Sequence, residues 1–319
     1  MLKKLLVGLD GSPIAETAVP YAETIAKATG GTITLLQAIE TDVGGGPLQE
    51  EKAHLAPVTA VMPSGLPHEA EEKARNARYS AQNYLDSILK RLGISGVPGE
   101  VTVVRGDPAS VIVDEAGARH CDLILLATHG RSGLGRLIFG SVAEAVLVKS
   151  PVPVLLTRVW SGGHVAEFGE AGAPILVALD GTPESERVLP LATELAKALA
   201  KGISLVEIVP AITQVPMSEG SWTQEIPADV QVREEEMASD YLTKVAGRLR
   251  ADGIPVVATV RTDTIGAGIV AAASDSNASL VVMATHAPTG LTRALVGSVA
   301  LEVLHRGGWP VLLVGPGAI

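Results

Sequence analysis

The sequence predicts an α/β protein made of two tandem doubly wound domains, each a five-stranded parallel sheet with helices on both faces. The first observation is a repeat: LLVGLDGSPIAETAVPYAETIAKA, from Leu5, aligns without a gap with ILVALDGTPESERVLPLATELAKA, from Ile175. The second is that each copy alternates short runs of Val, Ile and Leu with amphipathic segments, and such runs are typical of strands covered on both faces. This alternation predicts a parallel sheet that binds ligands at the carboxyl ends of its strands.

Five apolar runs in each repeat are the predicted strands. Apolar residues at helical spacing predict the intervening helices, for example Ala81, Tyr84 and Ile88, with Gly93 where that helix should stop. The strands are expected at residues 4–9, 32–39, 100–104, 123–127 and 152–157 of the first repeat, and at 175–179, 204–209, 256–260, 280–284 and 311–314 of the second.

Two stretches interrupt the repeat. Residues 44–69 are rich in Gly and Pro, which disfavour regular structure, and they account for the greater length of the first copy. Residues 160–173, WSGGHVAEFGEAGA, are the expected connection between the copies. The predicted organisation is therefore a first domain at 1–158, a linker at 159–173 and a second domain at 174–319.

Composition and charge exclude several classes of protein. The 319 residues are 47% hydrophobic, yet no apolar run is long enough for a membrane helix, so no membrane partner is expected. A net charge of −10 with scattered Lys and Arg argues against a nucleic-acid partner. A single cysteine, Cys121, fits a cytoplasmic location, and its place at the head of an apolar strand favours a small core residue over a redox sensor.

An aspartate follows the first strand of each repeat. Asp10 precedes Gly-Ser-Pro and Asp180 precedes Gly-Thr-Pro, which places both carboxylates at the carboxyl edge of the predicted sheets. Two interpretations stay open: the aspartates contact a ligand, or they only make a turn in which Ser12 or Thr182 caps the next helix.

A glycine-rich stretch, THGRSGLGRLIFGSVAEAV, follows the strand at 123–127 and ends in a predicted helix at 142–149. Gly140 and Ser141 stand at the start of that helix, where backbone N–H groups and the positive helix end favour an anion, and Arg131 and Arg136 could neutralise its charge. The alternative is a surface loop with an ordinary Ser cap. Neither the dinucleotide-binding order G-x-G-x-x-G nor a Walker G-x-x-x-x-G-K-[ST] motif occurs here.

These motifs resemble the universal stress protein family in its tandem two-domain form. The family's nucleotide signature is Gly, two residues, Gly, nine residues, Gly and then Ser or Thr, and this chain has Ala127, Gly130, Gly140 and Ser141 at those places. The LDGS, VVRGDP and PVPVLL segments strengthen the likeness, which covers nearly the whole chain twice. One departure is Ala127 in place of the first glycine.

The resemblance implies the adenine nucleotide alpha hydrolase-like fold and binding of ATP, with AMP and ADP as alternatives and Mg²⁺ or Mn²⁺ on the phosphates. It also implies a stress-response or regulatory role, with an interaction scaffold or a slow ATPase as the alternatives. No catalytic residue and no metal-ligating side chain are predicted. By position, the nucleotide-binding residues are Asp10, Gly11, Ser12, Ala38, Ile39, Ala127, Thr128, His129, Gly130, Arg131, Ser132, Gly133, Gly140, Ser141 and Val142, and more weakly Asp180, Thr182, Gly297, Ser298 and Val299.

The second repeat departs further from the signature. Ala284 and Ala287 replace its first two glycines, and Pro288 follows, which should narrow and stiffen the loop. The first domain is therefore the expected main nucleotide site, and the second is weakened or structural. The last strands of the two repeats are expected to pair as an intramolecular pseudo-dimer, covering exposed sheet edges. A homodimer of the whole chain stays open.

Overall fold

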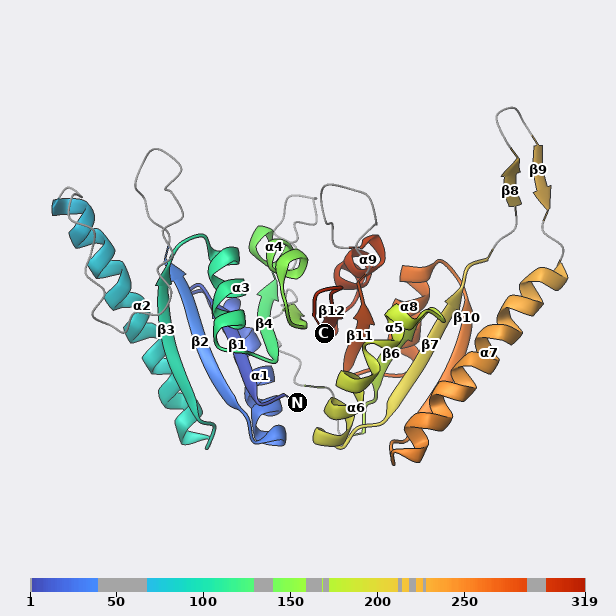
Figure 1. Ribbon diagram of the computed structural model, residues 1–319, viewed down its shortest axis with the longest axis horizontal. Helices are drawn as coiled ribbons and strands as arrows, with labels where there is room; N and C mark the ends of the chain where they lie inside the picture. Colours follow the sequence, from blue (N-terminus) through green and yellow to red (C-terminus); the bar gives the residue numbers. More distant parts are fainter. Residues whose placement is uncertain are drawn as a thin grey trace.

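Ten parallel and antiparallel strands form one continuous sheet that runs through both repeats (Figure 1). The structure, a computed structural model, describes residues 2–39, 68–128, 140–158, 168, 172–211, 214–217, 222–225, 228–285 and 297–318. The strand order is β10-β7-β6-β11-β12-β5-β4-β1-β2-β3. Helices cover both faces of the sheet, and α2 and α7 lie at opposite ends of the molecule (Figure 1).

The first repeat contains five strands that pair in parallel, as predicted. Its strands are β1 (Lys4–Leu9), β2 (Thr32–Ile39), β3 (Gly99–Arg105), β4 (Leu123–Thr128) and β5 (Val154–Arg158). Its helices are η1 (Ala15–Ala18), α1 (Val19–Thr29), α2 (His68–Ile94), α3 (Pro108–Ala118) and α4 (Ser141–Lys149).

The second repeat contains the same five-stranded parallel unit and adds a short antiparallel hairpin that the sequence did not predict. The strands of the unit are β6 (Ile175–Leu179), β7 (Ile203–Val209), β10 (Val256–Thr262), β11 (Leu280–Ala284) and β12 (Val311–Val314), and the hairpin is β8 (Gln214–Met217) with β9 (Trp222–Glu225). The helices are α5 (Pro183–Glu186), α6 (Leu189–Ala198), α7 (Ala228–Ala251), α8 (Ile265–Asp275) and α9 (Ser298–Arg306).

The two repeats join through their last strands. β12 pairs with β5 in the antiparallel direction, with Leu312 opposite Leu155. This confirms the predicted pairing of the two strands. Beyond the sheet, the Arg158 guanidinium donates to the backbone oxygens of Leu304 (2.7 Å) and His305 (2.5 Å), at the C-terminal end of α9. Such contacts satisfy carbonyls that a helix end leaves unpaired, so Arg158 ties the first repeat to the second.

The core has two layers, one on each face of the sheet, because successive side chains of a strand point to opposite faces. Leu5 and Val7 of β1 belong to the layer that also holds side chains of α1, α2, α6 and α7. Leu6, between them, belongs to the layer with α3, α4, α8 and α9. Burial on both faces explains why these strands are continuously apolar in the sequence.

Two predicted boundaries needed correction. The strand expected at 152–157 begins at Val154, because Ser150 Oγ accepts from Val152 N–H (3.2 Å) and holds those residues in a turn. The helix expected to stop at Gly93 continues to Ile94, and the left-handed residue that follows it is Gly96, with φ of 80°. Glycine adopts that conformation without steric cost, so Gly96 is the C-terminal signal.

The predicted linker, residues 159–173, contributes Phe168 and Ala173 to the buried core. Phe168 is 5% exposed and packs edge-on against the Tyr21 ring of α1, with the ring centroids 4.9 Å apart. The segment between the repeats is thus anchored on the first repeat at this position. Residues 159–167 and 169–171 of the predicted linker lie outside the described residues.

Cys121 is buried, and burial raises the pKa of its thiol to about 11. The thiolate is the reactive form, so this position is chemically inert, in agreement with the prediction of a small core residue. None of the helices in the described part of the chain is long and apolar enough to cross a membrane.

Candidate functional site

The carboxyl ends of β4, β1 and β2 meet at one edge of the sheet, because these strands are parallel neighbours. Asp10 directly follows β1, Ala38 and Ile39 end β2, and Ala127 and Thr128 end β4. The structure therefore brings these predicted residues to the same edge. His129, Gly130, Arg131, Ser132 and Gly133 lie outside the described residues.

Asp10 is exposed at the sheet edge and makes a turn. Its Oδ1 accepts from Ser12 N–H (2.8 Å), and Ser12 Oγ accepts from Ala15 N–H (3.1 Å). Gly11 between them has φ of 83°, a conformation that favours glycine. The turn predicted from the sequence is thus present, and it holds the carboxylate in place at the edge.

The second repeat builds the same turn around Asp180. Its Oδ1 accepts from the N–H (3.0 Å) and the hydroxyl (2.6 Å) of Thr182. Thr182 caps α5, since its Oγ1 accepts from Ser185 N–H (3.2 Å). The turn and the cap predicted for this repeat are both confirmed.

The N-terminal end of α4 lies beside this edge, and no described residue covers it. Gly140 is the N-cap, with φ of −58° and no side-chain cap, and a Cβ placed on it would meet no described atom within 4 Å. Ser141 is exposed and Val142 is partly buried. Unpaired N–H groups and the positive helix end make this a place for an anion. Gly297, with φ of −56° at the start of α9, has the same open surroundings.

Ala38 and Ile39 face opposite sides of the sheet. Ala38 packs on the layer of α3 and α4, the side on which Gly140 lies. Ile39 instead lines a separate cavity beneath α2. Of the two residues predicted to line a base, only Ala38 directs its side chain to the side of Gly140.

The second repeat has a cavity of about 290 Å³ at the equivalent edge, between β6, β7 and β11 and the helices α8 and α9. Asp180, Gly297, Ser298 and Val299, which the sequence assigned to a weaker site, all line it. Ile208, at the position of Ala38, fills part of this space with a larger side chain. The apolar wall of this cavity was not predicted from the sequence, and it is formed by Val206, Ile208, Ile265, Ile269 and Met283.

A polar residue beneath the aspartate turn differs between the repeats. It is Gln37 in the first repeat and Glu207 in the second. A Cβ on Gly11 would lie 3.8 Å from Gln37 Nε2, and one on Gly181 would lie 3.7 Å from Glu207 Oε1. Gln37 Oε1 and Glu207 Oε2 are buried without a hydrogen-bond partner among the described residues. Burial, and then the charges of Asp180 and Glu234, raise the pKa of Glu207 to about 6.

Replacing Glu207 by Gln, the residue of the first repeat, should stabilise the protein at pH 8 by about 1 kcal/mol after allowance for solvent screening. The folded chain holds this proton more tightly than the unfolded chain, whose Glu pKa is 4.5, so the native carboxyl loses stability as the pH rises from 4.5 through about 6. The gain should therefore vanish at pH 4.5. Urea unfolding of wild type and Glu207→Gln at both pH values measures it, and an equal gain at both would contradict the titration.

Among the described residues, no group of three or more His, Cys, Asp or Glu side chains is placed to hold a metal ion. The described site instead consists of a carboxylate, a small side chain and an open helix N-terminus. Such a set can accept hydrogen bonds from hydroxyl groups at one end of a ligand and donate N–H groups to an anion at the other.

Comparison with known proteins identifies relatives over the whole chain. The sequence matches the model of the Universal stress protein family over residues 1–158 and again over 173–315. A universal stress protein of Mycobacterium tuberculosis is 26% identical over 313 residues, which cover 97% of this chain and 96% of that protein. One of Thermus aquaticus is 31% identical over 163 residues, 50% of this chain and 100% of that protein. A solved universal stress protein of Archaeoglobus fulgidus has the same fold, with a TM-score of 0.67 at 19% identity and 99% coverage of both chains.

Proposed function

Because the chain belongs to the universal stress protein family, we propose that it is a regulatory protein of the stress response that binds ATP, mainly in its first repeat. The observation that carries the proposal is the meeting of Asp10, Ala38 and the open start of α4 at one sheet edge. AMP and ADP are the alternative ligands. The protein acts in the cytoplasm, and the domains are 1–158 and 174–319.

The residues present fit the parts of a nucleotide. The Asp10 carboxylate would accept hydrogen bonds from the ribose hydroxyls, and Ala38 leaves space for the base. The first N–H groups of α4 and the Ser141 hydroxyl would hold phosphate oxygens. Mg²⁺ or Mn²⁺, when bound, would neutralise phosphate charge, with the phosphates as its main ligands.

Two differences in sequence between the repeats favour the first repeat as the main nucleotide site. Ala38 is replaced by Ile208, whose larger side chain takes up space at the wall where the base would lie. Gln37 is replaced by Glu207, which places a second carboxyl near Asp180 and repels a polyanion when it is ionised. The cavity beside Asp180 supports the competing hypothesis, in which both repeats bind nucleotide.

Any hydrolysis is expected to be slow. The sequence has no Walker lysine, and only His129 stands in the glycine-rich segment as a candidate base. A scaffold that needs no nucleotide is the second candidate function. It would bind its partner equally well with and without ATP.

Calorimetric titration with ATP and Mg²⁺ of wild type, Gly140→Trp and Gly297→Trp tests the proposal. Both glycines have helix-compatible or extended φ values and open surroundings, so the substitutions should leave the fold intact. The indole at position 140 should block the start of α4, where the phosphates would bind, and weaken ATP binding by about 100-fold. Gly297→Trp should leave binding at the main site unchanged.

Three results would contradict parts of the proposal. Folded wild type that binds no adenine nucleotide would favour the scaffold. Two equal sites per chain, each lost in one variant, would remove the asymmetry between the repeats. Loss of binding only in Gly297→Trp would move the main site to the second repeat.

A further inference from the structure

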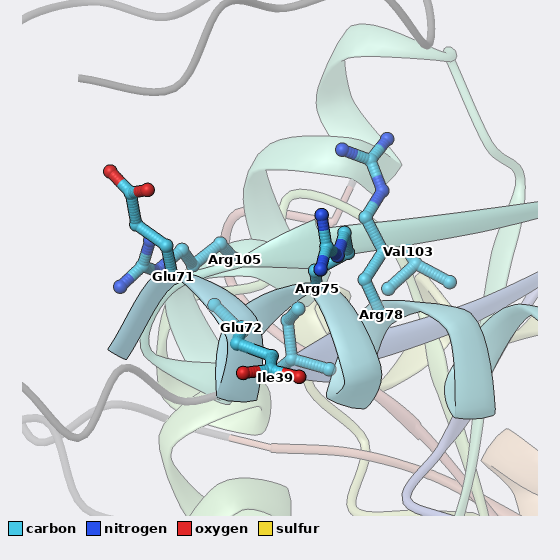
Figure 2. A pocket seen from close by; sticks show the side chains of 8 residues that line it. Ile39, Glu71, Glu72, Arg75, Arg78, Val103 and Arg105 are labelled. Carbon is cyan, nitrogen blue, oxygen red and sulfur yellow. The ribbon is translucent and has the colours of Figure 1, made fainter. Parts of the chain in front are cut away.

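A cavity of the first repeat lies on the face of the sheet opposite to Gly140, under the N-terminal half of α2 (Figure 2). Its volume is about 370 Å³. Three arginines line it: Arg75 and Arg78 from neighbouring turns of α2, and Arg105 from the end of β3. Ile39 and Val103 form an apolar floor from the adjacent strands β2 and β3, and Ala74, Glu71 and Glu72 complete the lining.

These arginines lack counter-ions within the described part of the chain. None of the three takes part in a hydrogen bond or ion pair there, although Glu71 and Glu72 line the same cavity. Other arginines of this repeat are paired: Arg91, farther along α2, contacts Glu16 at 2.8 Å. Three guanidinium groups around one cavity, with no partner among the described residues, stand out in a chain of net charge −10.

The equivalent positions in the second repeat carry a direct bond between helix and strand. Glu235 of α7 corresponds to Arg78, and Thr262 of β10 corresponds to Arg105. The Thr262 hydroxyl donates to Glu235 Oε1 at 2.6 Å. Hydrogen bonds from Thr262 and from Gln231 lower the pKa of Glu235, so this carboxylate is a satisfied acceptor. The first repeat replaces that bonded pair by two cations that face one cavity.

We propose that this cavity binds a small phosphorylated organic anion. A guanidinium donates two parallel N–H groups that match the oxygens of a phosphoryl group, and Arg75, Arg78 and Arg105 supply them from two different elements. The apolar floor of Ile39 and Val103 would contact the organic part of the ligand.

The arginine cavity is separate from the sheet edge at which the nucleotide is proposed to bind. Ile39 and Ala38 are successive residues of β2 with side chains on opposite faces, so the sheet itself lies between the arginine cavity and the start of α4. Binding here therefore requires neither Asp10 nor Gly140, and the inference stands independently of the ATP proposal.

The experiment is a calorimetric titration with inorganic pyrophosphate, at low ionic strength and without divalent ions, of the full chain. The main variant, Arg78→Glu/Arg105→Thr, gives the first repeat the bonded pair that the second repeat already uses, so it should fold. Arg75→Gln removes the third guanidinium. Lys90→Gln removes an exposed cation from the same helix away from the cavity, and it is the control matched in charge to Arg75→Gln.

Wild type should bind pyrophosphate, and the double variant should bind it at least about tenfold more weakly or lose one site per chain. Arg75→Gln should weaken binding in the same direction, and Lys90→Gln should keep it within about twofold. Gly140→Trp should remove only a site that the double variant retains. Absence of binding to folded wild type, or equal binding by the double variant, overturns the proposal. Loss in Gly140→Trp with retention in the double variant also overturns it, because the anion then occupies the nucleotide edge.

Discussion

Replacing Leu155 by Asp should lower the free energy of unfolding by about 4 kcal/mol or more. Leu155 is 1% exposed in β5 and lies opposite Leu312 of β12, which is fully buried. The substitution removes apolar contacts at the junction of the two repeats and leaves a carboxylate where no water reaches it. Both effects destabilise the β5–β12 pair, which joins the strands of the two repeats into one sheet.

Urea denaturation at pH 7.5, followed by circular dichroism, measures the effect of Leu155→Asp. The matched control is Val257→Asp, which changes an aliphatic residue of a strand to the same acid at a side chain that is 64% exposed. It should change stability by no more than about 0.5 kcal/mol. Equal losses in both variants would show that the cost comes from Asp in a strand and not from the junction.

Phe168→Ala should lower the free energy of unfolding by about 3 kcal/mol, the low end of the range for truncation of a buried aromatic side chain. Phe168 is 5% exposed and contributes a ring to the face of α1 that carries Tyr21. Truncation removes both its burial and the edge-on contact between the rings. The expected loss is large for a residue in a segment that has the composition of a linker.

The midpoint of urea unfolding tests this expectation, and Phe168→Leu serves as the comparison. Leu keeps most of the apolar burial but not the ring contact, so it should cost clearly less than Ala. A loss below about 0.5 kcal/mol for Phe168→Ala would show that this aromatic residue does not anchor the segment in solution.

The fold was predictable because its strands are covered on both faces. Runs such as Leu5 to Val7 have no polar interruption, and their alternation with helices indicates the parallel sheet directly. Phe168 was not predictable, since a single aromatic residue among Gly and Glu gives no periodic signal and its burial depends on a tertiary partner, Tyr21. The β8–β9 hairpin was missed for a similar reason: its strands are short and lie in a polar stretch.

The site was predictable where a motif fixes local backbone geometry. Asp10 and Gly140 follow from short segments whose turn and helix start are set by neighbouring residues. The arginine cavity was not, because Arg78 and Arg105 are 27 positions apart and meet only when α2 lies over β3. Glu207 could have been found by aligning it with Gln37, since one repeat then shows a charged group where the other shows a neutral one.

Because the two repeats belong to one chain, a substitution in one repeat leaves the other repeat unchanged. In a symmetric pair made from one gene product, every replaced side chain occurs twice, so any gain at one site is tied to its effect at the other. Here β5 and β12 form the same kind of junction within a single chain, and each position is inherited separately. A pair such as Gln37 and Glu207, or Arg105 and Thr262, could diverge only under that condition. The β5–β12 junction thus preserves the fold, while the side chains of each repeat can change independently of the other repeat.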